Sequence, residues 1–180
     1  MAKRAKARQK KKSAARRPPA RVKPIPAGYH TVTAYLTVRD AVRALEFYKG
    51  AFGAVETVRM PGPDGKSIMH AEVKIGDSPV MLSDEFPGMS TCKSPQSLGG
   101  TTVGLFLYVR DVDSAFKRAT DAGCKVLKSP EDMFWGDRFG SVLDPFGNQW
   151  SFATHKEDVP PKEMARRAQA AMAGKPGAAS

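Results

Sequence analysis

The chain has 180 residues and a net charge of +11, and it is long enough for one domain or two small modules around a hydrophobic core. No apolar run approaches the roughly 20 residues of a transmembrane helix, and no apolar signal segment follows the charged N-terminus. These features exclude transmembrane insertion, and we expect a cytoplasmic protein. Cys92 and Cys124 lack the spacing of a disulfide framework or a metal motif, so we expect both to be reduced and structural.

The first 27 residues form a basic tail. Residues 3–23 contain eleven basic side chains and no acidic ones, whereas the rest of the chain carries 18 of each. We expect residues 1–27 to be disordered, because so few large apolar side chains cannot offset the entropy of ordering. Two interpretations remain open: electrostatic contact with nucleic acid or an anionic membrane surface, and a solvated tail with no dedicated partner.

The next part of the chain predicts one βαβββ module, residues 28–86. Residues 30–38 are rich in β-branched and aromatic side chains and indicate a strand. Asp40 fits a helix N-cap, and a helical apolar pattern follows it until Gly53. Three antiparallel strands, separated by the turns at 61–66 and 76–77, are then predicted at residues 55–60, 67–75 and 79–83.

A second module, residues 101–158, repeats the first. A Pro, Gly and Ser-rich linker spans residues 86–101. The string YLTVRDAVRAL at 35–45 resembles LYVRDVDSAF at 107–116, so a Val-Arg-Asp corner again leads into a helix, which we expect to end at Gly123. The remaining strands are predicted at residues 125–127, 132–135, 141–144 and 149–154. The fold class is therefore α+β, with tandem βαβββ modules.

Residues 159–180 are expected to form a C-terminal helix and tail. Within the predicted helix at 162–173, Met164, Ala168 and Met172 share one face. This face is thin, which favours a docking or dimer-edge helix over a helix on a membrane surface.

His70 and Glu72 are candidate site residues on one predicted strand. Strand alternation places both side chains on the same face. They could act as a general base or as metal ligands, or they could form a structural polar pair across strands. We read His30 and His155, at the borders of the domain, as surface residues.

The segment FWGDRFGSVLDPFGNQW, residues 134–150, supplies four more candidates. Trp135 and Trp150 offer flat apolar walls for a ligand. Asp137 and Arg138 offer a carboxylate and a planar guanidinium fork for anion recognition. The alternative is that the aromatic residues are core and that Asp137 and Arg138 form a structural salt bridge.

Four strings carry a family resemblance: EFYKGAFGA (46–54), HAEVKIGDSPVMLSDE (70–85), KSPQSLGGTTV (93–103) and the 134–150 segment with its DPFGN turn. Together they resemble the vicinal oxygen chelate superfamily, which includes glyoxalase I, extradiol dioxygenases and bleomycin resistance proteins, and more closely its PhnB-like branch. The resemblance implies two cup-shaped sheets around a ligand pocket, often completed by dimerisation. In the family's enzymes, His and Glu from the first and last strands of each module hold a divalent metal.

The expected metal-ligand positions depart from that family pattern. They fall on Thr33, Leu82 or Ser83, Gly104 and Ser151, and none of these is a strong metal ligand. We therefore expect a homodimer that binds a small molecule at His70, Glu72, Trp135, Asp137, Arg138 and Trp150, with no cofactor and with a divalent metal only through atypical ligands. A metal-dependent lyase, isomerase or dioxygenase is the alternative, and nucleic-acid association through residues 3–23 is the second alternative.

Overall fold

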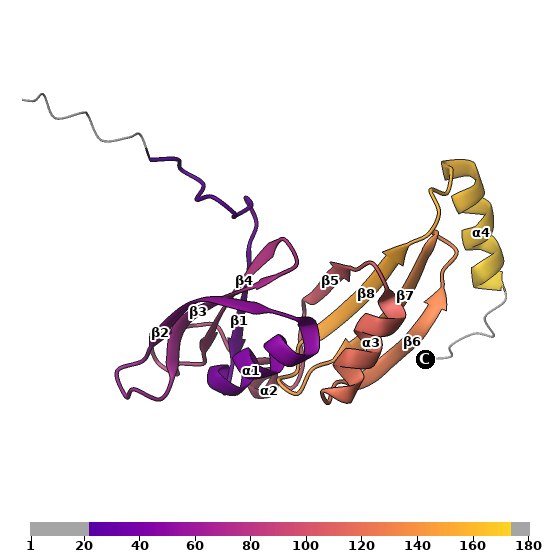
Figure 1. The fold of residues 1–180 in the computed structure, drawn as a ribbon. Coiled ribbons are helices and arrows are strands. Elements are labelled where there is room, and N and C mark those ends of the chain that lie inside the picture. Colours follow the sequence, from indigo (N-terminus) through magenta and orange to yellow (C-terminus); the bar gives the residue numbers. More distant parts are fainter. Residues whose placement is uncertain (1–21, 174–180) are drawn as a thin grey trace, which may run out of the picture.

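The protein consists of two βαβββ modules followed by a C-terminal helix, in a computed structural model that describes residues 22–173. Most of the predicted basic tail therefore lies outside the described residues. Figure 1 shows the two modules side by side, with α1 and α3 next to each other at their junction. Within residues 22–173, no helix is both long and apolar enough to cross a membrane.

The first module follows the predicted order. Its elements are β1 (Ala34–Val38), α1 (Ala41–Phe52), β2 (Val55–Pro61), β3 (Ile68–Ile75) and β4 (Ser78–Asp84), and the strand order in the sheet is β1-β4-β3-β2. The carboxylate of Asp40 caps α1 by accepting from the backbone N–H of Arg43 at 3.0 Å. Gly53 ends the helix with a left-handed φ of 65°, which glycine adopts without steric cost.

The second module repeats this plan after a short helix in the linker. Its elements are α2 (Pro95–Leu98), β5 (Gly104–Tyr108), α3 (Val112–Asp121), β6 (Lys125–Asp132), β7 (Asp137–Leu143) and β8 (Gln149–His155), with strand order β5-β8-β7-β6. Asp111 caps α3 as Asp40 caps α1, accepting from the backbone N–H of Ser114 at 3.1 Å. The C-terminal α4 (Pro161–Ala173) matches the predicted helix within one residue.

The predicted strand at 132–135 is wrong. Strand β6 runs through Pro130 to Asp132, and the following residues, 133–136, form the connection to β7. Because β6 lies at the edge of its sheet, Pro130 is tolerated there without an N–H group. The pairing of β6 with β7 is irregular at residues 126–131. Apolar and polar side chains therefore do not alternate regularly along β6, and its sequence does not indicate one continuous strand.

Each sheet is covered by helix on one face and left open on the other. Helix α1 covers the first sheet, in contact with β1, β3 and β4, and its Tyr48 and Phe52 also pack against Trp150 of the second module. Phe116 of α3 packs against the second sheet at Gly140. The first open face, opposite α1, carries Tyr35, His70, Glu72, Met81 and Ser83. The second open face, opposite α3, carries Phe106, Tyr108, Asp137, Phe139, Ser151 and His155. The two sheets do not pair with each other.

Candidate binding site

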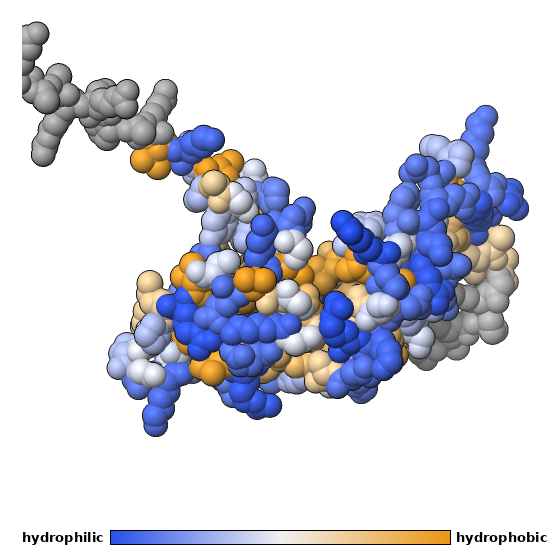
Figure 2. All heavy atoms as spheres, viewed as in Figure 1, coloured by the Kyte–Doolittle hydropathy of each residue, from blue (hydrophilic) through white to orange (hydrophobic). Residues whose placement is uncertain are grey.

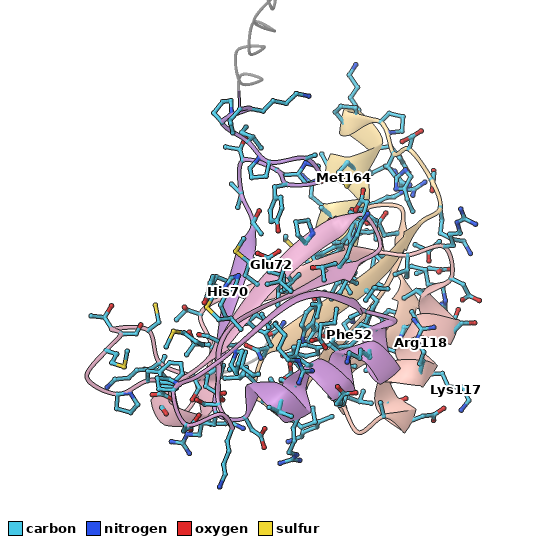
Figure 3. The ribbon with its side chains drawn as sticks, turned by 60° about the vertical axis from the view of Figure 1, so that its left-hand side comes forward. Phe52, His70, Glu72, Lys117, Arg118 and Met164 are labelled. Carbon is cyan, nitrogen blue, oxygen red and sulfur yellow. The ribbon has the colours of Figure 1, made fainter. Side chains whose placement is uncertain are left out.

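The first open face holds a chain of four hydrogen-bonded side chains. His70 Nε2 lies 3.0 Å from Glu72 Oε1, and the hydroxyl of Tyr35 lies 3.3 Å from His70 Nδ1. The hydroxyl of Tyr29 donates to the other oxygen of Glu72. Figure 3 shows His70 and Glu72 on the same strand, as expected from their spacing. The predicted pair therefore forms, and it is already engaged by two tyrosines.

These contacts affect the charge of Glu72. The hydrogen bond from Tyr29, followed by that from His70, lowers the pKa of Glu72, so this nearly buried carboxylate is ionised. A hollow of about 540 Å³ lies beside it, lined by Tyr29, His30, Thr33 and Met81 together with residues 24–26. The arrangement favours the structural polar pair, because the lone pairs of Glu72 that face Tyr29 and His70 are occupied.

The second open face carries a strip of aromatic side chains. Ring centroids lie 5.1 Å apart for Tyr108 and Phe106, 5.7 Å for Phe106 and Phe139, 5.9 Å for Phe139 and Trp135, and 5.0 Å for Trp135 and Phe134. We call these five residues the aromatic strip. Phe106 is 49% exposed and Tyr108 is 67% exposed. Phe134, Trp135 and Phe139 are half-buried. A run of contacting aromatic side chains that is partly exposed is typical of a binding face.

One end of the aromatic strip opens into an apolar hollow of about 760 Å³. Its walls are Met133, Phe134, Trp135 and Phe139 from the second module and the 171–172 turn of α4. The charged residues Lys128, Glu131 and Asp132 line its rim. The C-terminal helix thus contributes to a hollow on the open face, which is consistent with the docking role expected for it.

Asp137 forms hydrogen bonds with two residues of the aromatic strip. Its Oδ2 accepts from the Tyr108 hydroxyl at 3.1 Å and from Trp135 Nε1 at 3.1 Å, and its Oδ1 lies 2.7 Å from His155 Nδ1. His155 Nε2 also lies 3.0 Å from Asp158. The hydrogen bonds to Asp137 and then Asp158 raise the pKa of His155. Asp137 is only 4% exposed, and its hydrogen bonds to the Tyr108 hydroxyl and the Trp135 indole orient these two rings.

The contacts of Asp137 with His155, Tyr108 and Trp135 were not predicted from the sequence. His155 is exposed, as expected of a surface residue, and it also lies directly opposite Asp137 in the pairing of β7 with β8. The alternation of β8, in which residues 151, 153 and 155 share a face, was the available signal.

Arg138 and Trp150 lie away from both open faces. Arg138 makes two 2.8 Å bonds to Asp113 of α3, on the helix side of the sheet, and a 3.4 Å contact with Asp132. Trp150 is fully buried, and its Nε1 donates to Asp144 at 2.9 Å. In the described part of the chain these residues therefore form a structural ion pair and core, which corrects the expectation that they line the pocket.

The residues at the family's metal-ligand positions do not fit a metal centre. Leu82 is fully buried on the α1 side, Gly104 has no side chain, and Ser83 and Ser151 offer only hydroxyl groups. Residues 22–173 contain no group of three or more His, Cys, Asp or Glu side chains that could hold a metal ion. His70 and Glu72 supply two donors, and these bind each other.

Comparison with known proteins places this geometry in a family. Residues 29–152 match the family described as the Glyoxalase/Bleomycin resistance protein/Dioxygenase superfamily. The uncharacterised protein Rv0887c of Mycobacterium tuberculosis is 49% identical over 140 residues, which cover 77% of this chain and 79% of that protein. Among solved structures, TioX from Micromonospora sp. ML1 has a TM-score of 0.56 and 31% identity, covering 69% of this chain and 97% of TioX.

Two further solved structures support the same fold. The At5g48480 gene product of Arabidopsis thaliana has a TM-score of 0.56 and 30% identity, covering 69% of this chain and 98% of that one. A PhnB protein from Bacillus cereus has a TM-score of 0.54, with coverage of 69% and 99%, but at 14% identity the likeness concerns the fold alone.

Proposed function

The chain belongs to the Glyoxalase/Bleomycin resistance protein/Dioxygenase superfamily, and from this premise we propose that it binds a small planar apolar molecule on its second open face, without a conventional metal centre. The proposal rests on the aromatic strip, in which Phe106 and Tyr108 expose their rings while Asp137 orients Tyr108 and Trp135. Assignment to the PhnB-like branch is part of the proposal and rests on the four sequence strings.

Stacking supplies the affinity in this proposal. A planar ligand laid along the aromatic strip gains contact with several rings, and each aromatic pair contributes about 0.5–1.5 kcal/mol beyond simple burial. The hollow beside Trp135 is within the size range of small-molecule pockets. Glu131 at its rim pairs with Lys128, and Asp132 contacts Arg138 at 3.4 Å, so ring contacts rather than charge should decide the affinity.

We also propose that the binding unit is a homodimer. The aromatic strip forms one side of a site, and its residues Phe106 and Tyr108 remain largely exposed in the described chain. A partner whose first open face lies over the second open face of this chain would enclose the ligand. Such a closure would bury apolar surface that is now exposed to solvent.

Tryptophan fluorescence tests the binding site, because the two tryptophans have different positions. We expect the planar aromatic dye proflavine to quench Trp135, which lines the hollow, and not Trp150, which is fully buried. Phe139→Ala should weaken binding about tenfold through the lost ring contact. Val126→Ala, on the helix side of the same sheet, is the matched control and should leave affinity unchanged.

The same titration separates this function from a metal-dependent enzyme. Affinity in EDTA should equal affinity after incubation with Ni, Zn, Fe or Mn, because the residues at the expected ligand positions are poor metal donors. Stoichiometric retention of one of these metals, together with metal-dependent binding, would favour the lyase, isomerase or dioxygenase alternative.

The basic N-terminal residues favour a second candidate function, association with nucleic acid. Eleven basic side chains without an acidic one between residues 3 and 23 provide a sequence-independent attraction to phosphates. We expect the full chain to retain DNA at low salt and to release it as salt rises. Deletion of residues 1–25 should abolish retention, and retention by the truncated chain would contradict this role.

A further inference from the structure

A groove between the two modules combines an apolar floor with arginine side chains. Its volume is about 530 Å³. The floor is formed by Phe52, Leu107 and Phe152. The walls include the β3–β4 turn at residues 76–78 and two residues of the aromatic strip, Phe106 and Tyr108. Figure 2 shows apolar side chains gathered in the valley between the modules. We call this feature the inter-module groove; it is separate from the hollow beside Trp135.

Arg110 and Arg118 line the inter-module groove without acidic partners. Within residues 22–173, ion pairs engage five of the other arginines: Arg43, Arg59, Arg138, Arg166 and Arg167. No side chain among the described residues forms a hydrogen bond or an ion pair with Arg110. Arg118 uses its Nε to donate to the carbonyl of Ala51 at 3.0 Å, which holds the guanidinium beside Phe52; Figure 3 shows both side chains at the end of α1.

The internal duplication supplies a comparison for Arg110. Arg39 occupies the same place in the Val-Arg-Asp corner of the first module. Its guanidinium donates twice to the Ser97 hydroxyl, at 3.2 and 3.0 Å. The second module has no such acceptor for Arg110, so the same backbone corner presents a free guanidinium to the inter-module groove.

We propose that the inter-module groove binds a small amphipathic monocarboxylate, with its apolar body on the floor and its carboxylate between Arg110 and Arg118. A guanidinium is a planar fork of donors that matches a carboxylate, and the apolar surroundings strengthen the interaction relative to bulk water. Asp77 also lines the inter-module groove, and its charge disfavours a second negative group on the ligand. A volume of about 530 Å³ accommodates a two-ring body.

An NMR titration with 2-naphthoate and its neutral analogue 2-naphthamide tests this site on the full chain. We expect naphthoate to shift the backbone amides at 76–78 and 107–110 and to bind more tightly than naphthamide. Arg110→Gln should weaken naphthoate binding about tenfold and leave naphthamide unchanged. Arg39→Gln is the matched control from the first module and should change neither affinity.

Arg118→Gln should also weaken naphthoate binding and leave naphthamide binding unchanged. Because this variant loses the hydrogen bond from Arg118 to the Ala51 carbonyl, its melting temperature shows whether the fold is destabilised. Equal affinity for the acid and the amide, or full affinity in the Arg110→Gln variant, would overturn the proposal. Shifts centred on Phe134, Trp135 and Phe139, the part of the aromatic strip outside the inter-module groove, would also overturn it. Because the hollow beside Trp135 shares no lining residue with the inter-module groove, failure at the inter-module groove leaves the proposed binding at that hollow untouched.

Discussion

Asp137 and Asp144 are both buried carboxylates, but their partners give them different roles. Asp137 holds Tyr108, Trp135 and His155 at the second open face. Asp144 instead accepts hydrogen bonds inside the core, where no ligand reaches it. A buried aspartate alone therefore does not indicate a binding site. The position of the side chains that donate hydrogen bonds to it shows whether it belongs to a site or to the core.

The bond between Asp137 and His155 has a measurable consequence for pH dependence. Since hydrogen bonds to Asp137 and Asp158 raise the pKa of His155, its NMR titration should have a midpoint above the ordinary value of 6.5. Asp137→Asn should return the midpoint toward that value. An unshifted midpoint in the wild-type chain would contradict the contact.

The sign for stability follows from the same shift. A pKa raised on folding means that the stabilisation is fully present below the unfolded-state pKa and is lost as pH rises through the folded-state pKa. The difference in unfolding free energy between the wild type and His155→Gln should accordingly shrink with rising pH across that window, as measured by urea unfolding.

At the scale of the elements, the two modules use the same device to start their helices. Asp40 caps α1 and Asp111 caps α3, each by accepting from a backbone N–H three residues on. Loss of either cap leaves unsatisfied N–H groups at the helix N-terminus.

We expect Asp40→Ala and Asp111→Ala each to lower the melting temperature by about 2–4 °C. Asp40→Asn and Asp111→Asn are the controls, because the amide oxygen can still accept the hydrogen bond. Equal losses for the Ala and Asn variants would show that the charge, rather than the cap, matters. Calorimetry of the four variants distinguishes these outcomes.

The order and type of most elements could be predicted from the sequence. Helix α1 is bounded by an Asp cap and a Gly with positive φ, and both features are visible in the residue types. Strand β6 was misread because Pro130 and its irregular pairing interrupt the alternation. The four-residue α2 was missed because its sequence, PQSL, lies in a linker rich in turn-forming residues.

At the scale of the whole molecule, the open faces predict association. We expect sedimentation equilibrium to give about twice the chain mass of 19.5 kDa, since Phe106 and Tyr108 expose apolar surface on one open face. Phe106→Glu should shift the equilibrium to monomer. Val126→Glu, at an exposed position on the helix side, should remain dimeric; monomer mass for the wild type would contradict the proposed assembly.

The candidate site was only partly predictable, because strand register decides which side chains meet. The i, i+2 spacing of His70 and Glu72 was enough to place them together. Arg138 and Asp137 are adjacent on β7 and therefore point to opposite faces, and only the register shows which of them reaches the open face. The burial of Trp150 depends on packing against α1 of the other module, which no local pattern reveals.

The contact between Tyr48 and Asp144 joins halves of the chain that are 96 residues apart, at 3.0 Å and within the buried core. If either half unfolds alone, the other half keeps a buried Tyr48 hydroxyl or Asp144 carboxylate that has lost its hydrogen-bond partner, which costs free energy. Proteins built from repeated units can unfold in several steps, one unit after another. Here the shared carboxylate couples the units, so heating should produce a single cooperative heat-absorption peak.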